Sequence, residues 1–376
     1  RQAPEGAVTG RVINPGTGGG FVGATVASAG GPSATTDSTG SFTLNGLVPG
    51  DDLSLSASGG YVTVVFYDVP VRLGQTVYLG ELPMASSSGG GGNISASIVN
   101  ALDDTPVVGA TVSLFADINP PSSNPGSGIT TPLAVGQSTT DALGNVTFAS
   151  IPPGTYTYLV AAPGFSFTRK VVVSVSGASL PTRIALAPVV ADDAAALRVV
   201  LTWGDCQGGA SNLVPCDLDS HMTGPALSGE GRFHVAYFNR VESSGEDTLA
   251  VLDNDAKDGQ GPETVTLRPA TSGIHKYYVH NYSDAADSLS SRLSSARARV
   301  DVYRGANLIA TFYPPAKAQG VLWAVFQVDG STIAPVNEMI RIQDFPIVPG
   351  TFLRAPDADA DERRGIVRDW SRRPKP

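Results

Sequence analysis

The feature that most constrains the fold is an internal repeat in the first half of the chain. The segment VGATV at Val22–Val26 recurs at Val108–Val112, and TTDSTGSFTLNGLVPG at Thr35–Gly50 recurs as TTDALGNVTFASIPPG at Thr139–Gly154. The shared frame is Thr-Thr-Asp-x-x-Gly-x-φ-x-φ-x-x-φ-x-Pro-Gly, in which φ is an apolar residue, and it is too long to arise by chance. We therefore expect two tandem copies of one small domain.

The shared frame predicts turns that are followed by β-strands. Asp37 and Asp141 each begin a four-residue turn that ends in glycine, because an aspartate side chain can accept hydrogen bonds from its own turn and glycine tolerates a positive φ. Alternating apolar residues follow each turn and predict half-buried strands. The second copy also carries an insertion at 117–134 that is rich in proline, serine and glycine, and this composition predicts a long surface loop.

Both copies resemble the carboxypeptidase regulatory-like domain, a small transthyretin-like β-sandwich. The family pattern G-A-x-V, T-D-x-x-G-x-F and L-x-P-G-x-Y is matched in the first copy at Gly23, Ala24, Val26, Asp37, Gly40, Phe42, Pro49 and Gly50. In the second copy it is matched at Gly109, Ala110, Val112, Asp141, Gly144, Pro153, Gly154 and Tyr156, while Val146 stands where the pattern favours an aromatic residue. The resemblance implies spacer or adhesive units of secreted and surface proteins, without protease machinery.

The second half predicts a third, larger sandwich. Strand-like runs follow one another from Leu197 to Gly330 without an amphipathic helix, and only 288–298 suggests a helical turn. Separated motifs in this half, such as DLDSHMTGP and LDNDAKDGQGPE, resemble a bacterial surface-protein domain of unknown activity. We therefore expect an all-β chain of three tandem β-sandwich domains, the third jelly-roll-like or C2-like, divided as 1–84, a Ser/Gly linker at 85–92, 93–190, 191–337 and an extended charged tail at 338–376.

Composition and the cysteines favour an extracellular location. The net charge of −9 argues against nucleic acid as a partner, and no run of about 20 apolar residues exists to span a membrane. We interpret Arg1 in place of methionine as the product of signal-peptide removal. Cys206 and Cys216 flank a short loop and predict a local disulfide in an oxidising compartment, the alternative being two free thiols in a cytosolic protein.

Two acidic segments of the third domain predict a Ca²⁺ site. The candidate ligands are Asp217, Asp219, Asp253, Asp255, Asp258 and Glu263. Carboxylates brought together repel one another, and a hard divalent ion with oxygen ligands removes that cost. The alternative is that both segments are ordinary solvated turns. The four histidines (His221, His234, His275 and His280) are interpreted as structural, because their spacing matches no zinc motif.

The sequence carries none of the usual enzyme motifs, so we expect no catalytic activity. The tail keeps apolar residues suited to docking on a neighbouring subunit, namely Phe352, Leu353, Ile366, Val367 and Trp370. The leading hypothesis is a secreted structural protein that self-assembles into a fibre, sheath or surface layer through sheet edges and terminal extensions. The alternative is a monomeric cell-surface or periplasmic binding module that recognises a glycan or a protein through the third domain.

Overall fold

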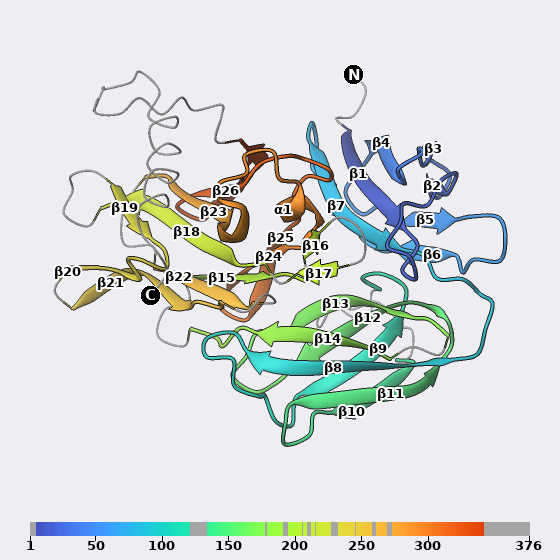
Figure 1. Cartoon of the computed structure of the whole chain (residues 1–376), viewed down its shortest axis with the longest axis horizontal. Coiled ribbons are helices and arrows are strands. Elements are labelled where there is room, and N and C mark those ends of the chain that lie inside the picture. Colours follow the sequence, from blue (N-terminus) through green and yellow to red (C-terminus); the bar gives the residue numbers. More distant parts are fainter. Residues whose placement is uncertain are drawn as a thin grey trace. The chain divides into compact units, whose positions relative to one another are not determined.

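The structure is a computed structural model, and strands dominate it (Figure 1). It describes residues 5–120, 134–176, 179–190, 195–204, 206–208, 212–214, 216–226, 232–244, 246–257, 261–268 and 273–341. The chain divides into two compact units, the first formed by the residues up to Val189 together with Ala306–Leu308, and the second by Val190–Gly305 and the residues from Ile309 onward. The expected all-β class built from β-sandwiches is confirmed. Within the described part of the chain, no helix has the length and apolar character needed to cross a membrane.

The first unit contains two sandwiches of the same topology, drawn in blue and in teal to green in Figure 1. Sandwich 1 consists of β1 (Gly6–Ile13), β2 (Thr25–Ser28), β3 (Ser33–Thr35), β4 (Ser41–Leu47), β5 (Leu53–Ser56), β6 (Val64–Phe66) and β7 (Thr76–Pro83). Its two sheets have the orders β4-β1-β7 and β3-β2-β5-β6. In the first sheet, β1 runs antiparallel to β4 and parallel to β7.

Sandwich 2 repeats this arrangement strand for strand. It consists of β8 (Gly92–Asn100), β9 (Thr111–Ala116), β10 (Gly136–Thr139), β11 (Asn145–Ile151), β12 (Gly154–Ala161), β13 (Thr168–Ser174) and β14 (Ser179–Leu186). The sheet orders are β11-β8-β14 and β10-β9-β12-β13, and β8 again runs antiparallel to one neighbour and parallel to the other. Each sandwich has its own apolar core, so the sequence repeat corresponds to a structural repeat.

The aspartate turns of the repeat have the predicted geometry. Asp37 Oδ1 accepts the backbone N–H groups of Thr39 (2.7 Å) and Ser41 (3.0 Å). Asp141 Oδ1 does the same for Leu143 and Asn145, at 2.9 and 2.8 Å.

The glycine that ends each turn is required for two reasons. Gly40 and Gly144 have φ values of 80° and 75°, a region that L side chains rarely adopt. A Cβ atom at either position would also lie 2.4 or 2.5 Å from a backbone carbonyl of the neighbouring strand. Glycine is therefore required at Gly40 and Gly144 both for the backbone conformation of the turn and for the close approach of the neighbouring strand.

The second threonine of the Thr-Thr-Asp frame links the turn to the VGA segment. Thr140 Oγ1 accepts the N–H of Ala110 (2.9 Å) and donates to the carbonyl of Val107 (2.6 Å), and the hydroxyl is buried. In sandwich 1, Thr36 Oγ1 makes the equivalent bonds to the backbone of Ala24 and Phe21. A buried backbone group needs a partner, and the threonine hydroxyl supplies one for both an N–H and a C=O.

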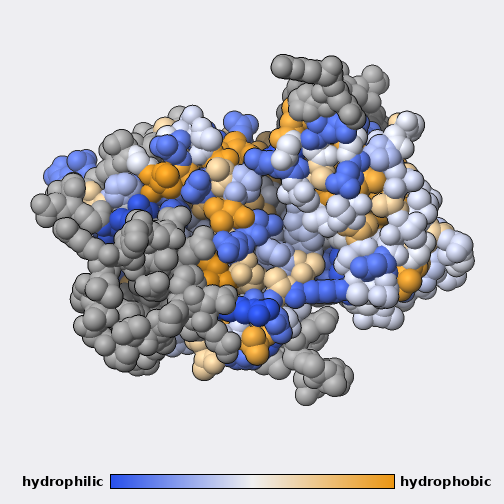
Figure 2. Space-filling view, turned by 90° about the horizontal axis from the view of Figure 1, so that it is seen from above, coloured by the Kyte–Doolittle hydropathy of each residue, from blue (hydrophilic) through white to orange (hydrophobic). Residues whose placement is uncertain are grey.

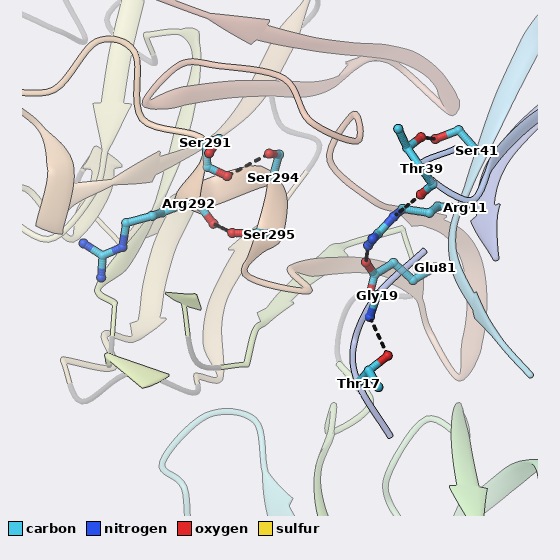
Figure 3. A network of polar contacts seen from close by, with 10 residues as sticks. All are labelled: Arg11, Thr17, Gly19, Thr39, Ser41, Glu81, Ser291, Arg292, Ser294 and Ser295. Atoms are coloured by element: carbon cyan, nitrogen blue, oxygen red, sulfur yellow. Dashed lines mark hydrogen bonds and ion pairs between the residues drawn. The ribbon is translucent and has the colours of Figure 1, made fainter. Parts of the chain in front are cut away.

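An arginine connects the strands of sandwich 1 to its turn (Figure 3). Arg11 on β1 places Nη1 2.7 Å from Glu81 Oε1 on β7, and its Nε donates to the carbonyl of Thr39 at 2.9 Å. Both side chains of the ion pair are partly exposed, so the pair itself contributes little to stability.

The Ser/Gly segment 85–92 is held by specific contacts. Ala85 is buried and its carbonyl accepts the N–H of Val62, while Ser87 bonds through its N–H (2.7 Å) and its hydroxyl (2.6 Å) to the carbonyl of Gly60. A Cβ atom on Gly91 would lie 2.7 Å from the carbonyl oxygen of Ser150. Gly91 therefore allows a close backbone approach, whereas the composition of the segment alone predicts a flexible linker.

The start of the predicted insertion joins the two sandwiches. Just beyond β9, the N–H of Ile118 donates to the carbonyl of Val65 on β6 (2.9 Å), and the carbonyl of Ile118 accepts the N–H of Tyr67 (3.0 Å). The Ile118 side chain is buried in the core of sandwich 1. The interpretation of 117–134 as a surface loop is therefore wrong for its first residues, which cover the edge of β6; residues 121–133 lie outside the described residues.

Polar side chains reinforce this junction. Asp117 Oδ1 accepts the N–H of Val65 at 3.0 Å. Asn119 donates from Nδ2 to the carbonyl of Tyr67 (2.9 Å) and accepts from Arg169 Nη1 (2.6 Å) on β13. Thr155 at the start of β12 donates to the carbonyl of Pro83 at 2.8 Å. Burial raises the pKa of Asp117, and the hydrogen bond from Val65 opposes that rise.

The second unit is one larger sandwich, sandwich 3. One sheet has the order β20-β21-β22-β15-β24-β25, formed by β15 (Leu197–Thr202), β20 (Val241–Ser244), β21 (Asp247–Asn254), β22 (Glu263–Leu267), β24 (Arg299–Arg304) and β25 (Asn307–Phe312). The other has the order β19-β18-β23-β26-β27, formed by β18 (Leu218–Pro225), β19 (Arg232–Val235), β23 (His275–Asn281), β26 (Leu322–Asp329) and β27 (Thr332–Ile340). Residues of both sheets form a single apolar core around Trp323 and Phe326.

The only helical elements among the described residues lie in this unit. They are the 3-10 turn η2 (Tyr282–Asp284) and the single turn α1 (Arg292–Ser295), which lies within the segment where the sequence suggests one helical turn. In α1, Ser294 and Ser295 donate their hydroxyls to the carbonyls of Ser291 (2.8 Å) and Arg292 (3.1 Å), as Figure 3 shows. Leu293 anchors the turn in the core.

The two cysteines lie at a small hairpin of β16 (Cys206–Gly208) and β17 (Asn212–Val214). Cys206 pairs with Val214, two residues before Cys216. Cys216 is buried, and its carbonyl accepts the indole N–H of Trp203 at 2.8 Å. The hairpin brings the backbone of the two cysteines toward each other, as the predicted local disulfide requires.

We predict that Thr140→Val destabilises the chain by about 1–3 kcal/mol, because it leaves the buried N–H of Ala110 and C=O of Val107 without a partner. Thr139→Val at the exposed neighbouring position is the matched control and should change stability little. Urea unfolding measures both. Equal losses for the two variants would contradict the role assigned to the buried hydroxyl.

We predict that Asp117→Asn is more stable than the natural chain at pH 7 and that the difference shrinks toward pH 4. Burial raises the pKa of Asp117 in the folded state, which means that folding favours the protonated carboxyl over the carboxylate. The resulting contribution to stability is present below the unfolded pKa and is lost as the pH rises through the folded pKa. Asparagine keeps the acceptor for Val65. Thermal melts at several pH values provide the test, and Asp117→Ala, which removes the acceptor, should be destabilised throughout.

We predict that Cys206 and Cys216 form a disulfide. A closed loop of this length contributes on the order of 3 kcal/mol in the chain-entropy model. Peptide mapping without reductant should recover the crosslinked peptide. Reductant should lower the melting temperature of the natural chain but leave that of Cys206→Ser/Cys216→Ser unchanged. Recovery of two free thiols from the natural chain would refute the prediction.

Candidate metal centre

Two neighbouring strands of sandwich 3 carry most of the residues of the candidate site, namely Asp219, His221 and His280. β18 and β23 are antiparallel, and the register places Asp219 opposite His280. Because side chains alternate along a strand, Asp219 and His221 project from the same face of β18. The sequence DLDSH thus delivers a carboxylate and an imidazole to one side, and β23 adds a second imidazole.

Three of the predicted calcium ligands come together. One carboxylate oxygen from each of Asp217, Asp219 and Glu263 lies within 4.8 Å of the others. Asp219 is 1% exposed and Glu263 is 0% exposed. Glu263 Oε2 also accepts the N–H of Ser220 at 2.5 Å, which connects the start of β22 to β18.

The backbone fixes Asp217 beside this cluster. Its N–H donates to Ser283 Oγ (2.9 Å), and its carbonyl accepts the N–H of Tyr282 (3.0 Å). Both partners belong to η2, directly after β23. Asp217 is therefore positioned by the same strand pair that carries Asp219 and His280.

Asp253 lies apart from this cluster. Val265 and Leu267 point from β22 into the core, so Glu263 shares their face, while Thr266 projects from the opposite face. Asp253 Oδ2 accepts the hydroxyl of Thr266 at 2.6 Å and therefore lies on that opposite face.

Burial raises the pKa of Asp253, opposed by the Thr266 hydrogen bond and the charges of Arg198 and Arg240. These contacts give Asp253 polar partners of its own on the outer face of the sheet. The structure does not bring Asp255 into either cluster of metal-ligating groups that it forms among its described residues. Asp258 lies outside those residues.

The histidines form the part of the site that the sequence did not predict. Asp219, His221 and His280 place one ligand atom each within 4.8 Å of one another, and all three are buried. His280 Nδ1 is 3.6 Å from Asp219 Oδ2. The signal that could have found them is the i, i+2 spacing of Asp219 and His221, but the pairing with His280 depends on strand register and cannot be read from spacing.

A third histidine lies behind His221. His221 Nδ1 and His234 Nε2, on β19, are 2.8 Å apart and share a hydrogen bond. Burial lowers the pKa of His234 to about 4. The fourth histidine, His275, lies at the far end of β23 and contacts Phe233. Three of the four histidines thus gather at one site.

The predicted assembly residues cannot be placed. Phe352, Leu353, Ile366, Val367 and Trp370 all lie outside the described residues. The assembly surface therefore stays a prediction from the sequence.

Comparison with known proteins gives one family match. Residues 93–187 match the model of the carboxypeptidase regulatory-like domain, and this segment contains the strands of sandwich 2 except for Gly92, the first residue of β8. The match covers well under half of the chain. A search of the curated proteins found no match. The resemblance of sandwich 1 to the same family stays a prediction from its sequence pattern.

Several solved structures match parts of this chain at low identity and low TM-score. They include the TIE protein of Bacillus anthracis (16% identity, 73% of this chain and 45% of that chain, TM-score 0.20) and the minor pilin GBS52 of Streptococcus agalactiae (14%, 49% and 96%, TM-score 0.22). A homologue of the telluride resistance protein TerD from Streptomyces coelicolor is 18% identical over 40% of this chain and 94% of that chain, with a TM-score of 0.29. This chain thus spans less than half of the TIE protein. Sandwich 2 is therefore similar to a carboxypeptidase regulatory-like domain.

Proposed function

We propose that the chain is a secreted structural protein, a subunit of an extracellular fibre, sheath or surface layer. The observation that carries this proposal is the junction between sandwiches 1 and 2. There, the segment after β9 hydrogen-bonds to the edge of β6, and Ile118 is buried in the core of the neighbouring sandwich. Two domains joined in this way hold a fixed spacing, which is what a load-bearing subunit requires.

The junction differs from a flexible linker in its chemistry. Backbone hydrogen bonds, a buried aliphatic side chain and the Asn119–Arg169 contact all act across it. The segment 85–92 is also bound to sandwich 1 through Gly60 and Val62. Domain interfaces of this kind restrict relative motion more than a Gly/Ser chain does.

The surface suits contacts spread over a large area. Figure 2 shows hydrophobic residues in small groups among hydrophilic ones on the visible face. Val22 and Val108, at equivalent positions of the two repeats, are 61% and 63% exposed. In the described part of the chain, β7 and β14 are outermost in their sheets. Edge strands are available for pairing with another chain, as in strand addition.

We predict that native material assembles into a regular polymer, visible by negative-stain electron microscopy and sedimentation. Deletion of 354–376, or the joint change Phe352→Ser and Trp370→Ser, should abolish assembly while leaving the circular dichroism spectrum intact. Val108→Ser, far from the tail in sequence, is the control for general loss of surface hydrophobicity.

The alternative function gives a different result in the same experiment. A monomeric binding module for a glycan or protein would remain as single particles at all concentrations. If polymers still form after the tail is deleted, the tail is not required for assembly, and the proposed role of the junction is unaffected.

We further propose that Asp217, Asp219 and Glu263 bind Ca²⁺. Three carboxylates at this distance repel one another, and two of them are buried, so a cation with oxygen preference would relieve the cost. Asp253 is not included, because it lies on the other face of its sheet beside Thr266.

We predict that Ca²⁺ raises the melting temperature of the chelator-treated chain. Saturation at about 100 times the dissociation constant adds roughly 2.7 kcal/mol. Glu263→Gln should remove this gain, whereas Asp253→Asn should keep it. A gain that is lost in Asp253→Asn but kept in Glu263→Gln would reverse the assignment of ligands, and a flat response in the natural chain would refute the site.

A further inference from the structure

We propose that Asp219, His221 and His280 bind a divalent first-row transition metal, with Zn²⁺ as the representative ion, and that this metal fastens β18 to β23. The site is distinct in chemistry from the carboxylate cluster, although Asp219 belongs to both. It does not depend on assembly into a polymer.

The geometry of the strand pair carries this inference. Asp219 and His280 are direct partners in the register, and His221 is two residues further along the same face of β18. The rings of His221 and His280 are 6.0 Å apart and nearly perpendicular. Each ligand is held on a paired strand, so all three are positioned before any ion arrives.

The distances are compatible with a tetrahedral ion. The three ligand atoms lie within 4.8 Å of one another. Ligands at the 2.0–2.1 Å typical of zinc lie roughly 3.4 Å apart. The separation of 3.6 Å between His280 Nδ1 and Asp219 Oδ2 is already close to this value.

The donor set selects the class of metal. Two imidazoles and one carboxylate suit zinc and its first-row neighbours, whereas Ca²⁺ takes oxygen ligands almost alone. The cluster of Asp217, Asp219 and Glu263, by contrast, offers only carboxylate oxygens. The two groups thus predict different ions, and they compete for the one side chain they share.

A neighbouring histidine orients one ligand. The hydrogen bond between His221 Nδ1 and His234 Nε2 fixes the His221 ring, so its Nε2 is the nitrogen that can coordinate the metal. Aromatic rings enclose the site: Phe238 is 6.3 Å from His221 and Tyr282 is 6.3 Å from His280, between ring centroids. All three ligands are buried, so the site is shielded from bulk solvent.

The test uses the full chain after chelation and dialysis, titrated with Zn²⁺ by calorimetry and followed by thermal melting. One equivalent should bind and raise the melting temperature. His280→Gln and His221→Gln should each weaken binding by at least about tenfold. His275→Gln, on the same strand but away from the site, is the matched control and should bind as the natural chain does.

X-ray absorption of the zinc-loaded natural chain supplies a readout that needs no variant and therefore remains decisive if His280→Gln fails to fold. Imidazole scattering from two histidines supports the proposal. An all-oxygen shell, unchanged affinity in His280→Gln, or no Zn²⁺ binding overturns it. A melting temperature raised by Ca²⁺ but not by Zn²⁺ would overturn this site and leave the calcium site standing.

Discussion

The backbone contact between Ile118 and β6 is the interaction on which the organisation of the first unit depends. It satisfies polar groups at the edge of β6 and places an aliphatic side chain in the core of the neighbouring sandwich. Removing it would expose both an apolar core and a sheet edge, two surfaces that favour unwanted association. The same few residues thus stabilise sandwich 1 and fix its distance from sandwich 2.

The parts of the fold that follow from local rules could be predicted from the sequence. Asp37 and Asp141 bond to their own turns, and Gly40 and Gly144 adopt positive φ, because these properties belong to the residue types themselves. The role of Thr140 was not predicted, since its partners, Val107 and Ala110, are 33 and 30 residues away. Long-range pairing, unlike turn chemistry, leaves no local signature.

The candidate site shows the same limit. Asp217, Asp219 and Glu263 were all predicted as ligands, and the structure brings them together, with Glu263 on the core-facing side of β22. Asp253 was also predicted as a ligand, but Leu252 faces the core, so Asp253 projects from the opposite face of β21, where it contacts Thr266. The acidic residues of the sequence do not by themselves show which face of a sheet each one occupies.

The glycines of segment 85–92 have a practical consequence for protein engineering. A Gly/Ser run between two domains is the usual place to insert an epitope tag or a fluorescent reporter. Here the carbonyl of Ser150 lies where a side chain on Gly91 would go, and Ser87 is bonded to Gly60. A tag or reporter inserted in this segment would disrupt its contacts with Ser150 and Gly60, so insertion sites should be sought elsewhere.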